Sequence, residues 1–273
     1  MKAQIVLVGC GNMGFAMLTG WLQKKAVEAP DVWVVEPTDA LRQRAAELSV
    51  NTVASADALP SDLTARLLLL AVKPQLMDAV LPAYRELVEH CDPAIVSVAA
   101  GIGVARFEDV YGTNRAVLRV MPNTPSAVGQ GMMVIYANAQ VSQAQLDFVH
   151  LLMEASGVAA VIEDEALMDA VTAVSGSGPA YLFHMVEALR QAATSAGLPS
   201  DLAHILAKQT IVGAANYADA ASDDVSKLRE QVTSPNGTTA AALAVLMRED
   251  AGLVGLMTEA VEAARKRSEE LGS

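Results

Sequence analysis

Short apolar runs alternate with amphipathic segments along the first part of the chain. The runs are mostly hydrophobic throughout, as is typical of parallel strands covered on both faces. They comprise Ile5–Val8, Val32–Glu36, Val50–Val53, Leu67–Val72, Ala94–Ala99 and Ala116–Val120. Segments with helical spacing of apolar positions separate several of them, at Met13–Lys24, at Asp39–Leu48 after the cap Thr38, and at Leu76–Val88. This alternation predicts a doubly wound α/β domain.

The pattern changes in the second part of the chain. Two further strands, Met132–Tyr136 and Val158–Ile162, enclose a helix that starts after the cap Ser142. Beyond Glu163 only helical patterns remain, at Glu165–Val174, Ala180–Ala196, Asp201–Ala218, Val225–Val232, Thr239–Arg248 and Ala251–Leu271. The sequence therefore predicts an α/β domain in residues 1–162 and an all-helical domain in residues 163–273.

Three glycines follow the first strand directly. The stretch reads Gly9, Cys10, Gly11, Asn12, Met13 and Gly14, and an amphipathic helix follows. In a dinucleotide-binding turn the first glycine permits the tight turn, the second admits a pyrophosphate and the third lets the helix pack on the strand. Free N–H groups at the start of the helix favour an anion there. Since glycines also cluster in other turns, the position behind a strand is what favours a Rossmann-type dinucleotide site.

An acidic residue, Glu36, ends the second predicted strand, roughly 20 residues after the glycine motif. A carboxylate at this point can accept hydrogen bonds from the adenosine ribose, whereas a 2′-phosphate would face a like charge. The alternative is an exposed acid at a strand end. The first interpretation makes NADH use plausible beside NADPH.

Three further turns lie at the carboxyl ends of predicted parallel strands, the edge at which open α/β sheets bind ligands. We expect cofactor contacts from Ala71, Val72, Lys73 and Pro74, from Val98, Ala99, Ala100 and Gly101, and from Pro122 and Asn123. Each turn alone is equally compatible with an ordinary loop.

Two loops of the helical part combine hydroxyls with glycines. One contains Ser175, Gly176, Ser177 and Gly178, and the other contains Ser234, Gly237, Thr238 and Thr239. Free N–H groups of Gly237, Thr238 and Thr239 at a helix start, with the hydroxyls of Ser234 and Thr239, would form a carboxylate site. Two plainly capped helix starts are the alternative.

Composition narrows the possible partners. The net charge of −12 argues against nucleic acid and anionic membranes as partners, and the 4% aromatic content leaves few platforms for stacking bases. The two cysteines form neither a disulfide framework nor a metal site. The chain starts with a strand and its apolar runs are too short for a bilayer, so we expect a cytoplasmic protein.

The chain resembles pyrroline-5-carboxylate reductases over essentially its whole length. The resemblance rests on the glycine motif and on Ala71–Pro74, Met121–Pro125, Ser175–Tyr181 and Thr233–Thr239, taken together. The resemblance implies reduction of 1-pyrroline-5-carboxylate to L-proline with NADPH or NADH, the last step of proline biosynthesis. It also implies a homodimer through the helical domain, often assembled into rings of dimers. Asn236 stands where the family usually has Gly, and Glu36 stands where many members have Ser or Thr.

The resemblance and the loop composition suggest a mechanism without a general base, because a protonated cyclic imine is already electrophilic. Thr239 would orient the ring nitrogen, Ser234, Gly237 and Thr238 would hold the carboxylate, and the loop from Ser175 to Gly178 would close the pocket.

Two other functions remain to be weighed. A β-hydroxyacid dehydrogenase would need a catalytic Lys on the helix after the first loop, and Ala180–Ala196 has none. A dinucleotide sensor without turnover would have no need of a carboxylate pocket.

Overall fold

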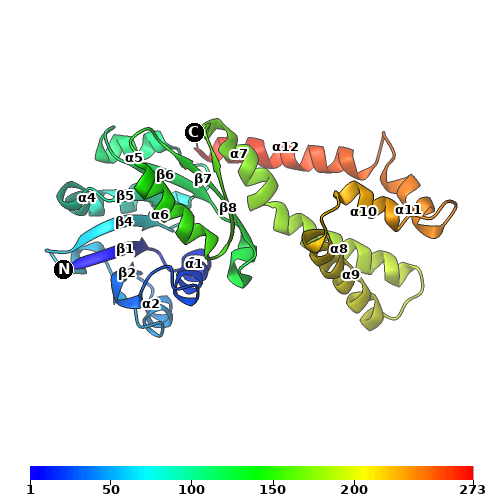
Figure 1. The fold of residues 1–273 in the computed structure, drawn as a ribbon, viewed down its shortest axis with the longest axis horizontal. Coiled ribbons are helices and arrows are strands. Elements are labelled where there is room, and N and C mark those ends of the chain that lie inside the picture. Colours follow the sequence, from blue (N-terminus) through cyan, green and yellow to red (C-terminus); the bar gives the residue numbers. More distant parts are fainter. Residues whose placement is uncertain (273) are drawn as a thin grey trace. The chain divides into compact units, whose positions relative to one another are not determined.

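The computed structural model describes residues 1–272. It contains one eight-stranded sheet, part of the ribbon drawn in Figure 1. Its strands are β1 (Lys2–Val8), β2 (Val32–Val35), β3 (Asn51–Val53), β4 (Thr64–Leu70), β5 (Ala94–Ser97), β6 (Val117–Met121), β7 (Gly131–Ala137) and β8 (Gly157–Ile162). Their spatial order is β3-β2-β1-β4-β5-β6-β7-β8. The first six strands are parallel, β7 runs antiparallel to β6, and β8 runs parallel to β7. The order reverses after β3, as the predicted doubly wound topology requires.

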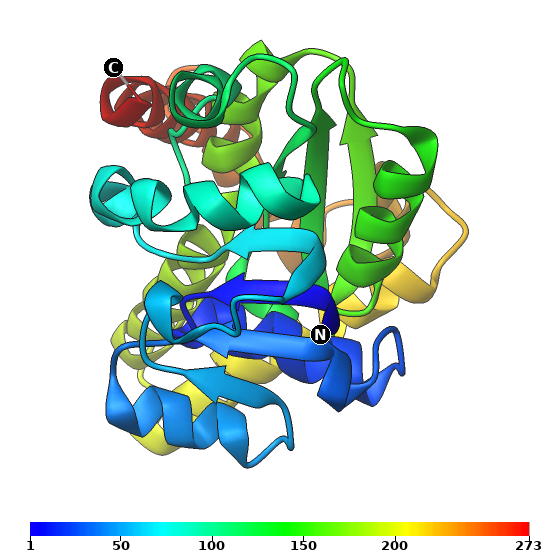
Figure 2. The ribbon, with the colours of Figure 1, turned by 90° about the vertical axis from the view of Figure 1, so that its left-hand side faces the viewer.

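Helices cover both faces of this sheet (Figure 2). One face carries α1 (Asn12–Gln23), α2 (Asp39–Ala46) and α6 (Gln143–Glu154), and the other carries α3 (Met77–Val80), α4 (Arg85–Cys91) and α5 (Val104–Tyr111). Alternation along β1 divides the core, because Ile5 and Leu7 belong to the first face while Val6 and Val8 belong to the second. The part of β1 that is covered on both sides, Ile5–Val8, is thus apolar at every position.

The remaining chain is helical, as predicted. After α7 (Met168–Val171) come α8 (Gly178–Ser195), α9 (Ser200–Ala220), α10 (Val225–Gln231), α11 (Thr238–Leu246) and α12 (Leu253–Gly272). Strands end with β8, so the fold class expected from the sequence is confirmed. Within residues 1–272 no helix has the length and apolar character needed to cross a bilayer.

The two compact units of the structure divide the chain at other positions than the predicted domain boundary after residue 162. The first unit extends to Ser177 and includes the end of α12 from Ala264 onward, and the second unit spans Gly178–Ala263. Two side-chain bonds connect residues beyond position 162 within the first unit. Glu165 accepts from the Arg119 guanidinium at 2.7 Å, and the Ser268 hydroxyl donates to Asp169 at 2.6 Å. These polar contacts carry no hydrophobic periodicity, so the sequence pattern did not reveal them.

Three local predictions need correction. The helix α5 was not predicted. The single helix expected over Leu76–Val88 is divided into short pieces, with Pro74 and Pro82 each at the start of a 3₁₀ turn. The expected break at Gly176–Pro179 is largely helical, because a π-helical turn, η7 (Thr172–Gly176), joins α7 to the region of α8.

Candidate active site

The glycine turn between β1 and α1 has the geometry of a phosphate cradle. Gly9 has φ +86°, and a Cβ there would lie 2.9 Å from the Ala71 carbonyl oxygen. A Cβ on Gly14 would overlap the Gly9 carbonyl, whereas one on Gly11 would meet open space. The first intrahelical bond of α1 runs from Phe15 N–H to the Gly11 carbonyl at 2.9 Å. The N–H groups of Asn12, Met13 and Gly14 therefore precede the helical ladder and remain for an anion.

Glu36 is far more buried than the exposed acid that the alternative interpretation assumed, with 5% of its surface accessible. Its Oε2 accepts the Cys10 N–H at 2.7 Å, and its Oε1 accepts the Thr38 N–H at 2.9 Å. The carboxylate is thus fixed between the glycine turn and the start of α2. Thr38 begins that helix, as predicted, but without a capping bond from its own side chain.

A cleft of about 550 Å³ opens beside this carboxylate. It is lined by several predicted cofactor residues, namely Gly9, Gly11, Glu36, Ala71, Val72 and Lys73. Its other walls come from the ends of β2 and β3 and from the segment around Leu76 to Tyr84. The cleft thus lies at the carboxyl ends of β1, β2 and β4, the edge at which open α/β sheets generally bind ligands.

Arg44 contacts the glycine turn, and the sequence pattern did not predict this contact. Its guanidinium donates to the carbonyls of Cys10 at 3.0 Å and Gly11 at 3.4 Å, and it stacks 3.9 Å over the Phe15 ring. A cation therefore supports the glycine turn from α2. Nothing in the local pattern distinguished Arg44 from Arg42 on the same helix.

Cys10 lies inside the turn and is fully buried. Burial raises the pKa of its thiol to about 11, with the negative charge of Glu36 adding to the rise and Arg44 opposing it. The thiol is protonated at neutral pH, which agrees with a packing role rather than a nucleophile.

The remaining residues that were predicted to bind the cofactor do not line the larger cleft. Met13 and Asn12 line a separate cleft of about 480 Å³ with Arg44 and Thr124. Pro74 starts a 3₁₀ turn, Ala99 and Pro122 are buried, and Val98, Ala100 and Gly101 do not line the larger cleft. The Asn123 side chain is engaged within the protein, donating to the Ser175 carbonyl at 3.1 Å.

The first hydroxyl loop belongs to the first compact unit up to Ser177. In the π-helical turn the Ser177 N–H donates to the Thr172 carbonyl at 2.8 Å. Such turns are often found at functional sites. Ser175, Gly176, Ser177 and Gly178 are all half-buried. The loop is therefore partly accessible, as a binding role requires.

The second loop lies in the second compact unit and precedes α11. Asn236 adopts the left-handed conformation with φ +58°. One expectation needs correction, because the Gly237 N–H is not free but donates to the Ser234 carbonyl at 3.0 Å. The intrahelical ladder starts when the Ala241 N–H donates to Gly237, so the N–H groups of Thr238 and Thr239 stay available for an anion.

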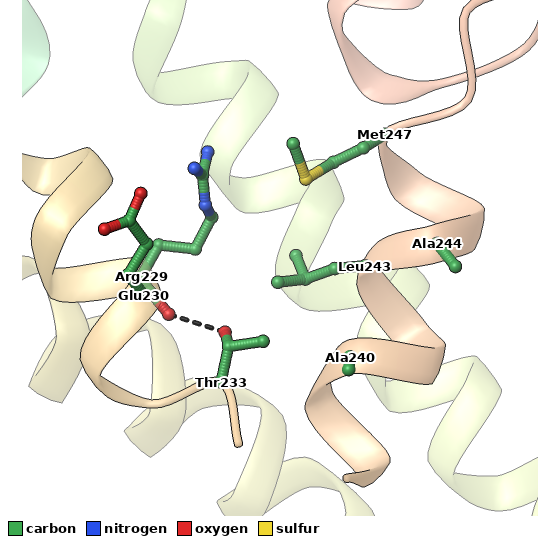
Figure 3. Close-up of a pocket in the computed structure, with 7 residues that line it drawn as sticks. All are labelled: Arg229, Glu230, Thr233, Ala240, Leu243, Ala244 and Met247. Carbon is green, nitrogen blue, oxygen red and sulfur yellow. Dashed lines mark hydrogen bonds between the residues drawn. The ribbon is translucent and has the colours of Figure 1, made fainter. Parts of the chain in front are cut away.

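Thr233 lies beside this loop but has a different role. Its hydroxyl donates to the Arg229 carbonyl at 2.6 Å, which closes the end of α10 (Figure 3). A cleft of about 320 Å³ between α10 and α11 is lined by Arg229, Glu230, Thr233, Ala240, Leu243, Ala244 and Met247. Figure 3 shows Leu243 and Met247 reaching from α11 toward α10. This mostly apolar cleft contains none of the residues predicted to bind substrate.

Among the described residues, no group of three His, Cys, Asp or Glu side chains could hold a metal ion. The prediction of a metal-free site stays a prediction.

Two family models match the chain. Residues 165–271 match the model described as pyrroline-5-carboxylate reductase dimerisation. Residues 4–101 match the model described as NADP oxidoreductase, coenzyme F420-dependent. The two matches follow the division of the chain into a sheet and a helical part.

Curated relatives match nearly the whole chain. The pyrroline-5-carboxylate reductase of Pseudomonas aeruginosa is 41% identical over 98% of this chain and 96% of its own. That of Synechocystis is 38% identical over 100% of this chain and 99% of its own.

Solved structures agree with these relatives. A pyrroline-5-carboxylate reductase from Coxiella burnetii is 30% identical with a TM-score of 0.91, and 99% of each chain is covered. The Plasmodium falciparum pyrroline carboxylate reductase with NADP bound is 27% identical with a TM-score of 0.83, covering 99% of this chain and 98% of its own. With both parts of the fold, the cradle and the relatives in agreement, the chain belongs to the pyrroline-5-carboxylate reductase family.

Proposed function

We propose that this chain reduces 1-pyrroline-5-carboxylate to L-proline by hydride transfer from NAD(P)H, the last step of proline biosynthesis. The observation that carries the proposal is the turn before α11. It presents the unpaired N–H groups of Thr238 and Thr239 together with the hydroxyls of Ser234 and Thr239, and residues 232–246 contain no titratable side chain. Such a turn can bind a carboxylate and orient an imine, and it offers no base for alcohol oxidation. The curated relatives with this name support the same chemistry.

The roles of the substrate residues follow from this chemistry. The N–H groups of Thr238 and Thr239 and the Ser234 hydroxyl would bind the substrate carboxylate, aided by the positive end of α11. The Thr239 hydroxyl would hydrogen-bond the ring nitrogen. Gly237 contributes as the N-terminal cap that leaves the next two N–H groups free. The hydroxyls of Ser175 and Ser177 would complete the polar contacts.

The cofactor cleft fits a nicotinamide dinucleotide, because a Cβ at Gly9 or Gly14 would close the turn and the start of α1 offers free N–H groups. When bound, the reduced nicotinamide supplies the hydride for the imine carbon. Gly11, Asn12 and Met13 would hold the pyrophosphate. Glu36 would accept from the ribose hydroxyls and disfavour a 2′-phosphate, so we propose use of NADH as well as NADPH.

The helical part supports a homodimer. Large apolar side chains of the second unit are exposed, including Phe183 at 65%, Ile205 at 60%, Val254 at 78% and Leu256 at 61%. A soluble chain seldom leaves so many uncovered, and residues 165–271 match the family's dimerisation model. We propose dimerisation through these helices and assembly of dimers into a ring, which sedimentation of the purified protein would resolve. A cytoplasmic location stays a prediction.

A spectrophotometric assay tests the proposed activity. Protein, 1-pyrroline-5-carboxylate and NADH or NADPH are mixed, the absorbance of the reduced cofactor is followed, and proline is identified by amino-acid analysis. We expect decay that requires both substrate and cofactor. A folded protein that gives no decay with either cofactor would refute the proposal.

A further inference from the structure

Asn123 connects three segments at the carboxyl edge of the sheet. It follows β6, and its Oδ1 accepts the N–H of Met132 in β7 at 2.9 Å. Its Nδ2 donates to the Ser175 carbonyl at 3.1 Å and lies 3.4 Å from the Ser175 hydroxyl oxygen. Both ends of the amide are thus used inside the first compact unit. The place of Asn123 at a strand end led us to expect a cofactor contact, which stays a prediction, and its side chain is bonded within the protein.

The sequence explains why the Ser175 carbonyl needs an outside donor. In a regular α-helix this carbonyl would accept the N–H of the residue four positions later. That residue is Pro179, which has no N–H. The chain widens here into the π-helical turn, whose Ser177 N–H reaches back to the Thr172 carbonyl at 2.8 Å. The Asn123 amide replaces the donor that Pro179 cannot supply.

We propose that Asn123 is a positioning residue for catalysis, holding the Ser175–Ser177 loop in place at the sheet edge that ends β6. This inference rests on the proposed function, in which the hydroxyls of that loop contact the substrate. An amide is needed because the position requires one acceptor and one donor at once. Losing the donor would release the Ser175 peptide, and small displacements of positioning groups reduce turnover strongly.

The chain offers a matched control at the other end of the same two strands. Asn138 follows β7, where its Oδ1 accepts the Val117 N–H at 3.1 Å and its Nδ2 donates to the Arg115 carbonyl at 3.0 Å. The chemistry of this clamp is the same, but it holds no substrate loop. Asn123→Asp and Asn138→Asp each keep the acceptor and replace the donor by an oxygen that repels the carbonyl.

The first readout is kinetic. Asn123→Asp should lower kcat/KM for 1-pyrroline-5-carboxylate by about tenfold or more. Its Kd for NADH, measured by fluorescence, should change by less than about twofold. Asn138→Asp should leave both values near those of the unsubstituted protein. A tenfold weaker Kd for NADH with unchanged substrate kinetics would overturn the proposal and assign Asn123 to the cofactor.

The second readout does not depend on activity. Hydrogen exchange followed by mass spectrometry should show about tenfold faster exchange in the peptide that covers residues 172–178 in Asn123→Asp, and no such change in Asn138→Asp. Equal exchange of this peptide in the two variants would refute the clamp. If the unsubstituted protein lacks reductase activity, the proposed function fails, and exchange still decides whether Asn123 holds the loop. Asn123→Ala, which removes the amide without adding charge, provides a second variant should the aspartate form misfold.

Discussion

Replacing Glu36 by glutamine removes a negative charge from the cofactor cleft and one of the two hydrogen bonds that fix this side chain. The carboxylate accepts from Cys10 N–H at 2.7 Å and from Thr38 N–H at 2.9 Å through different oxygens. Glutamine has only one acceptor oxygen, so its NH₂ group must face one of these two N–H donors. The substitution therefore tests whether the buried acid holds the turn and whether it selects the cofactor.

The stability effect follows from burial. Glu36 is 5% exposed, so the abandoned N–H group has little access to water. Leaving a buried donor unsatisfied costs about 2 kcal/mol. For a domain of this size that loss lowers Tm by about 4–8 °C. Thermal unfolding of Glu36→Gln beside the unsubstituted protein measures it, and an unchanged Tm would contradict the bonding described above.

The cofactor effect follows from charge. Without the carboxylate, a 2′-phosphate meets one negative charge fewer, and we expect the ratio of kcat/KM for NADPH to that for NADH to rise by about tenfold. Glu47→Gln is the matched control, because Glu47 lies just after α2 and is exposed. It should leave the ratio unchanged. An identical ratio in Glu36→Gln and the unsubstituted protein would refute cofactor selection by Glu36.

Three further substitutions test separate parts of the account. Thr239→Val should reduce kcat by about tenfold to a hundredfold with little change in the Kd for NADH. Thr233→Val, whose lost hydroxyl donates to the Arg229 carbonyl, should leave kcat unchanged. Unaltered turnover in Thr239→Val would show that its assigned role is wrong. Asn236→Ala should lower the unfolding free energy, measured in urea, by about 1 kcal/mol, because alanine is strained at the left-handed φ of +58°. Asn236→Gly should not lower it. An alanine variant as stable as the unsubstituted protein would exclude backbone strain at this position. Burial raises the pKa of the Cys10 thiol from 9.0 to about 11, so the thiol of the unfolded chain ionises first and the unfolding free energy should decrease as pH rises from about 9 to about 11. Cys10→Ala should lose this part of the pH dependence. An unchanged pH dependence in that variant would speak against the shifted pKa.

Much of the fold could be predicted because the core has a simple periodicity. The last four residues of β1 and of β4 are all apolar. The glycine turn follows from the need of Gly9 and Gly14 to approach neighbouring backbone closely. Helix starts were also predictable where the cap is local. Ser142, for example, forms a complete capping box with Gln145.

What could not be predicted depends on contacts between distant residues. The first compact unit contains pairs such as Arg119 with Glu165, which are 46 positions apart. The Ser175 carbonyl of the π-helical turn accepts from the Asn123 amide, 52 positions earlier in the chain. Pro179 indicated that the helix would be disturbed, but only the fold shows which side chain compensates for its missing N–H.

The candidate site divides in the same way. Local composition predicted a helix start near Thr239 with free N–H groups and hydroxyls, because these are local features, and its carboxylate role stays a prediction. It predicted a free N–H group at Gly237, whereas this N–H donates to the Ser234 carbonyl. It also missed Arg44, because a basic residue on a solvated helix has no pattern that reveals contact with the Cys10 carbonyl.

Transfer of a labelled hydride tests the central claim most directly. The protein is incubated with 1-pyrroline-5-carboxylate and NADH deuterated at the transferable position of the nicotinamide, and the product is analysed by mass spectrometry. The account predicts proline carrying one deuterium at the ring carbon that was doubly bonded to nitrogen. Proline without deuterium, or no proline from a protein that binds NADH, would contradict direct hydride transfer to the imine.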